Sequence, residues 1–192
     1  MKGHLFFVVV VWLIFSCQDP VDNRVDQVTA GGDLLALEAL GDDQYLTTSL
    51  SKGRVSASTK GNVVTLNIEL DGFSANSSHA IHLHNGSCED PGAHWNQNST
   101  KSFCAEESLG LQWRKSYAGD IGNISTDSQG HGYLTLSTDL WTLNTGLDSD
   151  ILNKVLVIHE RAEDFGPECF ILTAHDHDGN SKIACGRIEL LD

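Results

Sequence analysis

The chain has 192 residues, of which 40% are hydrophobic and 20% are charged, and this composition is typical of one globular domain with a single core. Twelve basic residues stand against 26 acidic ones, and the resulting formal net charge of −14 argues against a nucleic-acid partner, because backbone phosphates attract clustered Lys and Arg. Eighteen glycines and many Asn, Asp, Ser and Thr residues indicate frequent turns and therefore a β-rich fold.

The first 17 residues predict an export signal. Lys2 gives a short positive start, and residues 5–15 form an almost continuous apolar run, shorter than the roughly 20 residues of a membrane-spanning helix. The run leads into Ser16-Cys17, which resembles a bacterial lipobox, in which the cysteine sulfur receives a lipid. We therefore expect a cell-envelope lipoprotein (periplasm or outer membrane) that is anchored to a membrane through Cys17. The alternative is a secreted protein in which Cys17 is incidental.

Residues 18–32 are polar and predict a tether, so the folded domain is expected at residues 33–192. Within that domain, residues 64–70 alternate between apolar and polar side chains, which is the period-two pattern of a half-buried strand. Lys60-Gly61-Asn62 predicts a hairpin that joins this strand to a partner. The expected strands span residues 34–40, 53–59, 64–70, 79–84, 120–126, 132–137, 154–160 and 183–190.

Eight short strands without a convincing amphipathic helix predict an all-β fold, either an antiparallel sandwich or a barrel. Two long segments, residues 94–119 and 161–181, show no regular pattern. Each starts at or near a histidine, and long irregular loops in compact domains are often functional. We therefore expect these two segments to contribute to the active site.

The histidines indicate a metal site. His82 and His84 lie on one face of a predicted strand, because alternate residues of a strand point to the same side. His159 ends the buried apolar run 155–158, and His94 follows in the loop after Cys88. A single histidine more often caps or packs than binds a metal. Together these four predict a transition-metal site with nitrogen ligands, for which copper and zinc are both suitable.

The cysteines agree with export. There are five, at positions 17, 88, 104, 169 and 185. If Cys17 carries a lipid, the remaining four suit two disulfides in an oxidising compartment. Four cysteines allow three pairings, and the spacing does not choose among them.

Five motifs make a family resemblance specific. The segments HAIHLHNGSC, PGAHWN, AGDIGNIS, VLVIHERAEDFG and KIACG occur in the order and approximate spacing of the copper/zinc superoxide dismutase family, with its exported bacterial branch the most similar. The resemblance covers about residues 34–191. It implies an eight-stranded Greek-key β-barrel with two long active-site loops. It also implies the conversion of superoxide into dioxygen and hydrogen peroxide at a histidine-bound copper.

The resemblance assigns roles to individual residues. It implies that copper is bound by His82, His84, His94 and His159, and that His94 also takes part in catalysis by accepting a proton. His79 would support the ligand strand by hydrogen bonding. Asp120 matches the zinc-binding aspartate of the family, and Cys88 and Cys185 match its disulfide.

The zinc site departs from the family pattern. Residues 95–119 contain no histidine, and Tyr117 stands where one of the zinc ligands belongs. His94 and Asp120 alone do not make a tetrahedral zinc site. We therefore expect a copper-only or zinc-poor protein in which Asp120 hydrogen-bonds the second nitrogen of His94. The alternative is that His175 or His177 supplies replacement ligands, although a polar loop tip is the commoner role for such residues.

Three further departures concern the loops and the substrate path. Cys104 and Cys169 have no counterpart in the family pattern, and we hypothesise that they form a second disulfide that substitutes structurally for zinc. Lys182 stands where the family has an arginine that attracts superoxide, and lysine keeps the charge but loses the planar fork. Glu163 replaces an aspartate near the metal, and either it or Asp164 could bridge the loops.

These departures leave alternative functions open. A superoxide dismutase is the reading we favour, with superoxide as substrate and copper as cofactor. A non-catalytic copper-binding envelope lipoprotein is the alternative, and a barrel that has lost its chemistry is a third reading, disfavoured by the four retained histidines. The sequence does not distinguish a monomer from a homodimer.

Overall fold

The computed structural model describes residues 27–96, 118–163 and 180–191. In these ranges the protein is built of β-strands joined by turns and loops. The strands are β1 (Thr29–Gly41), β2 (Gln44–Lys60), β3 (Val63–Leu70), β4 (Ser78–His84), β5 (Asp120–Ser125), β6 (Gly132–Thr138), β7 (Val155–His159), β8 (Lys182–Arg187) and β9 (Glu189–Leu190). The same ranges contain no helix that is long and apolar enough to cross a membrane.

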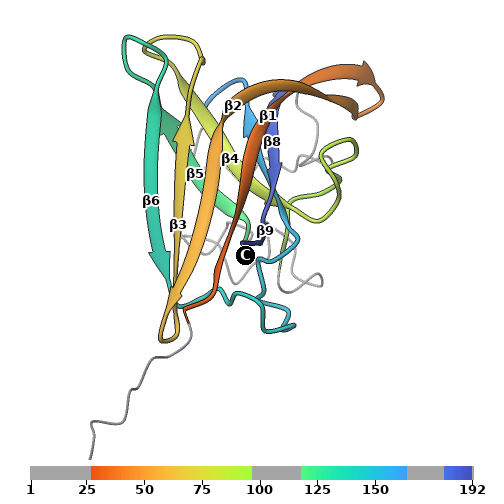
Figure 1. The fold of residues 1–192 in the computed structure, drawn as a ribbon. Helices are drawn as coiled ribbons and strands as arrows, with labels where there is room; N and C mark the ends of the chain where they lie inside the picture. The colour runs from red at the N-terminus through yellow and green to blue at the C-terminus, as the bar shows by residue number, and fades with distance from the viewer. Residues whose placement is uncertain (1–26, 97–117, 164–179, 192) are drawn as a thin grey trace, which may run out of the picture.

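The strands form one antiparallel sheet that curves into a nearly closed barrel (Figure 1). Their order is β5-β4-β7-β8-β1-β2-β3-β6, and the short β9 pairs with β1 outside this path. The chain crosses between β3 and β4 and again between β6 and β7, because each of these consecutive pairs lies apart in the sheet. The predicted all-β, eight-stranded Greek-key barrel is therefore confirmed.

All the expected strands are present, but β2 begins at Gln44, nine residues before the expected start at residue 53, and the limits also differ at the two ends of the domain. β1 begins at Thr29, so the last four residues of the segment expected to be a tether lie in the sheet. Gly31 and Gly32 explain this difference, because a Cβ on either would meet a backbone oxygen of a neighbouring strand at 2.4 or 2.2 Å. At the other end, residues 183–190 divide into β8 and β9, with the buried Ile188 between them.

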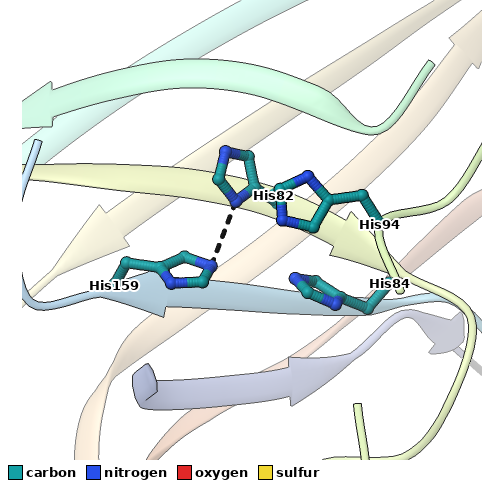
Figure 2. Close-up of side chains that lie close together, drawn as sticks. All are labelled: His82, His84, His94 and His159. Carbon is teal, nitrogen blue, oxygen red and sulfur yellow. Dashed lines mark hydrogen bonds between the residues drawn. The ribbon is translucent and has the colours of Figure 1, made fainter. Parts of the chain in front are cut away.

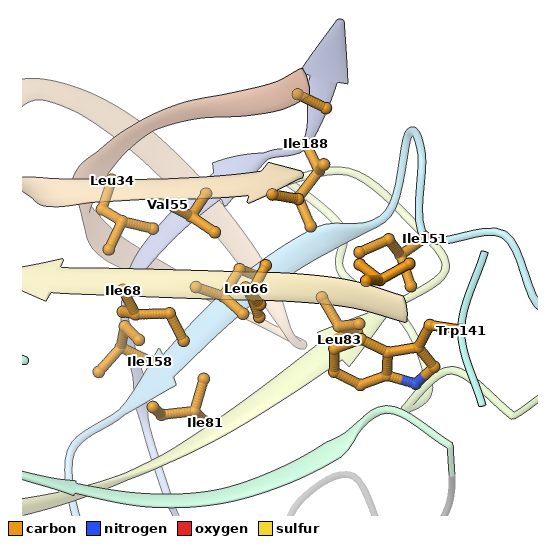
Figure 3. Close-up of a cluster of buried hydrophobic side chains, with 14 of the residues drawn as sticks. Leu34, Val55, Leu66, Ile68, Ile81, Leu83, Trp141, Ile151, Ile158 and Ile188 are labelled. Carbon is orange, nitrogen blue, oxygen red and sulfur yellow. The ribbon is translucent and has the colours of Figure 1, made fainter. Parts of the chain in front are cut away.

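The core fills the interior of the barrel (Figure 3). β3 shows the predicted alternation, with Val64, Leu66, Ile68 and Leu70 buried. Alternation also orients the central strands β4 and β7, where every second residue enters the core. The core residues of these two strands are Ile81, Leu83, Leu156 and Ile158.

The opposite face of β4 and β7 is also buried. β7 is buried along its whole length, and β4 is buried from its second residue onward. Val155, Val157 and Cys185 form a second apolar cluster, against which Leu37 and Cys88 pack. The residues of β4 and β7 that point away from the core therefore lie under loops and neighbouring strands. The histidines belong to this layer.

Candidate metal centre

Four histidines converge in this layer (Figure 2). His82 and His84 come from β4, His159 ends β7, and His94 comes from the loop that follows β4. Each offers one ring nitrogen, and these nitrogens all lie within 4.8 Å of one another. In the described part of the chain this is the one group of three or more metal-ligating side chains that could hold an ion.

Two features of the sheet place these side chains. The register of β7 against β8 shifts between Ile158 and His159, and His159 lies opposite Lys182. His94 reaches the cluster through an antiparallel bridge to His84. The next residue, Trp95, is buried in the core and its amide donates to the carbonyl of Leu83 at 2.7 Å, which anchors the loop.

Oxygen acceptors determine which nitrogen of each ring faces inward. His84 donates from Nδ1 to the carbonyl of Gly92 at 2.8 Å, and His159 donates from Nδ1 to the carbonyl of Asn180 at 3.1 Å. Because a neutral imidazole has one N–H, Nε2 of each ring is left with a lone pair. His82 is the reverse case, since its Nε2 contacts Glu163 at 2.7 Å and its Nδ1 faces the cluster.

The inward nitrogens fit a metal ion. Nε2 of His84 is buried and has no hydrogen-bond partner among the described residues. Nδ1 of His82 and Nε2 of His159 are 3.0 Å apart, and both carry lone pairs when their outer nitrogens donate to oxygen. Two such lone pairs repel unless a cation lies between them. Imidazole nitrogens in this arrangement suit copper or zinc.

Burial keeps these rings in the form that binds metal. Desolvation by burial, with the charge of neighbouring histidines, lowers the pKa of His82 and of His159 to about 3. The same two causes hold the pKa of His84 well below its usual value. The charge of Lys182 is a further cause for His82 and His159. The three rings are therefore neutral at pH 7, as metal ligation requires.

Asp120 lies beside His94, as expected. His94 Nδ1 and Asp120 Oδ1 are 2.8 Å apart, and the two side chains are 9% and 5% exposed. A carboxylate in this position makes Nδ1 the protonated nitrogen and directs Nε2 toward the cluster. The other residues on which the zinc interpretation depends, Tyr117, His175 and His177, lie outside the described residues.

Glu163 contacts the metal cluster from the loop after β7. It is held there by Asn123, whose Oδ1 accepts from the Glu163 amide at 2.8 Å and whose Nδ2 donates to the Glu163 carbonyl at 2.9 Å. Asn180 makes the same reciprocal pair with the backbone of Arg161, at 2.8 and 3.0 Å. The sequence analysis missed both asparagines, because nothing distinguishes them from the many other turn residues. Asp164 lies outside the described residues.

His79 is not part of the cluster. Its Nδ1 donates to the carbonyl of His159 at 2.9 Å, and its Nε2 is 2.7 Å from Ser77 Oγ. It therefore links the start of β4 to the end of β7, next to the residues that carry three of the four clustered rings. This is the supporting role that the resemblance implied.

Lys182 is buried in an ion pair that the sequence analysis did not predict. It is buried, and its Nζ donates to Asp43 Oδ1 at 2.5 Å and lies 5.4 Å from the centre of the Tyr45 ring. The sequence analysis placed Lys182 beside the metal but missed Asp43. No local signal could identify this partner, because 139 residues separate the two.

A disulfide joins Cys88 to Cys185, with 5.6 Å between the two Cα atoms. It links the loop that precedes His94 to β8, and Cys185 belongs to the second apolar cluster. Cys17, Cys104 and Cys169 lie outside the described residues, so the lipid anchor and the second disulfide remain predictions.

Comparison with known proteins gives a consistent result. The family model described as "Copper/zinc superoxide dismutase (SODC)" matches residues 50–188. The chain is 30% identical over 132 residues to a superoxide dismutase [Cu-Zn] of Candida albicans, a match that covers 66% of this chain and 80% of that protein. It is 26% identical over 142 residues to an extracellular superoxide dismutase [Cu-Zn] of Caenorhabditis elegans, covering 71% of this chain but 60% of that protein.

Solved structures share the fold at lower identity. A SOD-like protein from Bacillus subtilis is 20% identical, with a TM-score of 0.58 over 82% of this chain and 96% of that chain. The clock protein EA4 is 19% identical, with a TM-score of 0.59 over 85% of this chain and 95% of that one. These likenesses establish the barrel architecture.

Proposed function

Because the chain belongs to the copper/zinc superoxide dismutase family, we propose that it converts superoxide into dioxygen and hydrogen peroxide at a histidine-bound copper, without a functional zinc site. The observation that carries the proposal is the convergence of four imidazole nitrogens within 4.8 Å. All four histidines fall within the stretch that the family model matches.

In this proposal His82 binds copper through Nδ1, and His84, His94 and His159 bind it through Nε2. Bound copper would supply one-electron chemistry, so that one superoxide is oxidised to dioxygen and a second, with two protons, is reduced to hydrogen peroxide. Glu163 and the carbonyls of Gly92 and Asn180 hold three of the rings in orientation.

His94 is the proposed proton carrier. Its Nδ1 donates to Asp120, so Nε2 carries the lone pair that would hold copper, and this atom would accept a proton only when it is not bound to the metal. In a zinc-containing relative a metal would occupy the Nδ1 side. Here the buried carboxylate of Asp120 takes over the orienting part of that role.

The substrate is an anion, and the protein as a whole repels it. The formal net charge is −14, so attraction must come from charges near the metal. Lys182 is the proposed source, because it lies opposite His159 in the sheet. Its point charge lacks the planar fork of arginine, and we expect slower and more salt-sensitive turnover than in an arginine-bearing relative.

We also propose that the protein is exported. The Cys88–Cys185 disulfide suits an oxidising compartment, and the relative from Caenorhabditis elegans is named an extracellular enzyme. Attachment to the cell envelope through a lipid on Cys17 is the form of export that the signal sequence favours, and secretion is the alternative.

One observation favours a second function. The charge of Lys182 is offset by Asp43, which weakens the local attraction for an anion. A copper-binding protein of the envelope that sequesters or transfers the metal would not need that attraction. Retention of copper without dismutation would support this alternative.

The deciding experiment is the rate of superoxide decay with protein that holds one copper and no zinc. The proposal predicts rapid decay that is unchanged by added zinc and is lost in His159→Ala. His131→Ala is the matched control, because its side chain is 54% exposed and lies outside the cluster. If the protein binds copper but does not speed up superoxide decay, the enzymatic proposal is overturned and the copper-binding alternative remains. Failure of the wild-type chain to bind copper would overturn both.

A further inference from the structure

The long hairpin of β1 and β2 extends over the start of β8, where it places two polar side chains around Lys182. We propose that Asp43 and Tyr45 are positioning residues that fix Lys182 and offset its charge, and that they thereby set how strongly the metal site attracts small anions. This inference rests on the proposed copper site and deepens it, because it concerns selection of the substrate class.

The first support is the way in which the hairpin is built. Asp42 and Asp43 form its turn, with φ of 49° and 59°. This left-handed conformation is one that Asp and Asn tolerate better than most residues. It presents the Asp43 carboxylate to Lys182 Nζ, at 2.5 Å. The Tyr45 hydroxyl donates to the same carboxylate oxygen at 3.1 Å.

The second support is that hydrogen bonds to Glu89 also hold the hairpin in place. The Tyr45 amide donates to the carbonyl of Glu89 at 2.9 Å, and Thr47 Oγ1 donates to Glu89 Oε1 at 2.8 Å. Glu89 directly follows Cys88, which is disulfide-bonded to Cys185 on the same strand as Lys182. The positions of Asp43 and Lys182 are therefore linked through the hydrogen bonds to Glu89 and the adjacent disulfide, as well as through their ion pair.

The third support is burial. The side chain of Lys182 is 2% exposed and that of Asp43 is 22% exposed. An ammonium removed from water in this way needs a partner, and water cannot screen the pair as it screens surface charges. Seen from the metal site, a paired Lys182 acts as a dipole, whose attraction for an anion is weaker than that of a free cation. The ring of Tyr45, 5.4 Å from Nζ, covers part of the remaining surface of the ammonium.

Azide is a suitable probe, because it is a small anion that binds Cu(II) and its charge-transfer absorption can be titrated without superoxide. In the copper-loaded full chain, Asp43→Asn should tighten azide binding by about three- to ten-fold. Lys182→Met should weaken it, because the Asp43 carboxylate is left without its partner. The double variant Asp43→Asn/Lys182→Met should return to near the wild-type azide affinity, because an ion pair with no net charge is replaced by two neutral side chains.

Asp42→Asn is the matched control. Asp42 is exposed, lies in the same turn, also has a positive φ and loses the same charge on substitution. It should change azide affinity less than about two-fold, because surface charges are screened. If Asp43→Asn does not fold, the comparison of Lys182→Met with the double variant still gives the sign of the Asp43 effect.

Equal azide affinity in wild type and Asp43→Asn, or equal changes in Asp42→Asn and Asp43→Asn, would overturn the inference. So would a double variant as weak as Lys182→Met. Superoxide decay is measured separately, so a copper-loaded protein that binds azide as expected but does not dismutate superoxide would contradict the proposed function and leave the role of Asp43 supported.

Discussion

His94 Nδ1 and Asp120 Oδ1 lie 2.8 Å apart although 26 residues separate them in the chain. Gly119 explains how they meet, because its amide donates to the carbonyl of Trp95 at 2.9 Å and its carbonyl accepts from Leu83 at 2.8 Å. A Cβ at this position would lie 2.6 Å from the carbonyl oxygen of Leu83. The glycine thus lets the start of β5 approach the loop that carries His94.

We predict that Asp120→Ala lowers copper affinity by about 10- to 100-fold, because the His94 ring loses the acceptor that fixes its tautomer and orientation. The copper affinity of Asp120→Asn should lie between those of Asp120→Ala and wild type, since an amide oxygen can still accept the hydrogen bond. A competition titration with a copper chelator measures the effect. Asp139→Ala, at an exposed site, should match wild type. Unchanged affinity in Asp120→Ala would show that Asp120 does not orient His94.

Glu163 should act on the metal through His82. Its Oε2 is 2.7 Å from His82 Nε2, and a neutral Gln at this position forms a weaker hydrogen bond to the ring. We expect Glu163→Gln to reduce copper affinity by about ten-fold and to change the spectrum of bound Cu(II). Glu160→Gln is the matched control, because Glu160 is exposed and lies in the same segment. Identical spectra and affinities for the two variants would contradict the role of Glu163.

The metal-free protein should lose stability in mild acid. His82 and His159 have a folded-state pKa of about 3, below the value near 6.5 of an unfolded chain. Below pH 6.5 the unfolded state therefore binds more protons than the folded state. The free energy of unfolding then falls by about 1.4 kcal/mol per pH unit for each ring until the folded-state pKa is reached. His84 acts in the same direction.

Urea unfolding of the metal-free protein at pH 7.5, 6.0 and 5.0 measures this loss, which bound copper should reduce because it competes with protons for the ring nitrogens. His131→Gln should keep the slope, since its ring is exposed and lies outside the cluster. A stability that does not change between pH 7.5 and pH 5.0 would mean that the clustered rings are not buried as neutral groups.

Local patterns were enough to predict most of the barrel and most of the cluster. β3 follows the period of two without interruption, and the same period places His82 and His84 on one side of β4. The start of β2 was predicted at residue 53 instead of Gln44, because the missed stretch pairs with the part of β1 where the register changes three times, the first shift falling at Leu34/Leu35. A pattern of period two is lost across each such irregularity.

Local sequence patterns could not predict which residues distant in the chain contact one another. Asp43 has the appearance of an ordinary turn residue, and its effect on Lys182 depends on how the hairpin packs against a strand 139 residues away. The asparagines at positions 123 and 180 were missed for the same reason, because both act on the backbone of a distant loop. The family motifs identified the ligands, but the residues that orient the ligands depend on tertiary contacts.

The Cys88–Cys185 disulfide should stabilise both the fold and the metal site. It closes a loop of 97 residues, and constraining a loop of that length in the unfolded chain contributes about 2–5 kcal/mol. We therefore expect the double variant Cys88→Ser/Cys185→Ser to lose stability in that range in urea unfolding of the metal-free protein. Substituting both cysteines leaves no new free thiol at either position.

The same variant should also bind copper more weakly. The disulfide fixes the loop in which the Gly86 amide donates to the carbonyl of Pro91 at 3.0 Å, and the same loop supplies the Gly92 carbonyl that orients His84. When the loop loosens, His84 and His94 lose part of their preorganisation, so copper affinity should fall together with stability. A variant that is less stable but binds copper as tightly as wild type, measured well below its unfolding midpoint, would show that β4 alone positions the ligands. A variant that keeps full stability would show that the closed loop is already constrained by the sheet.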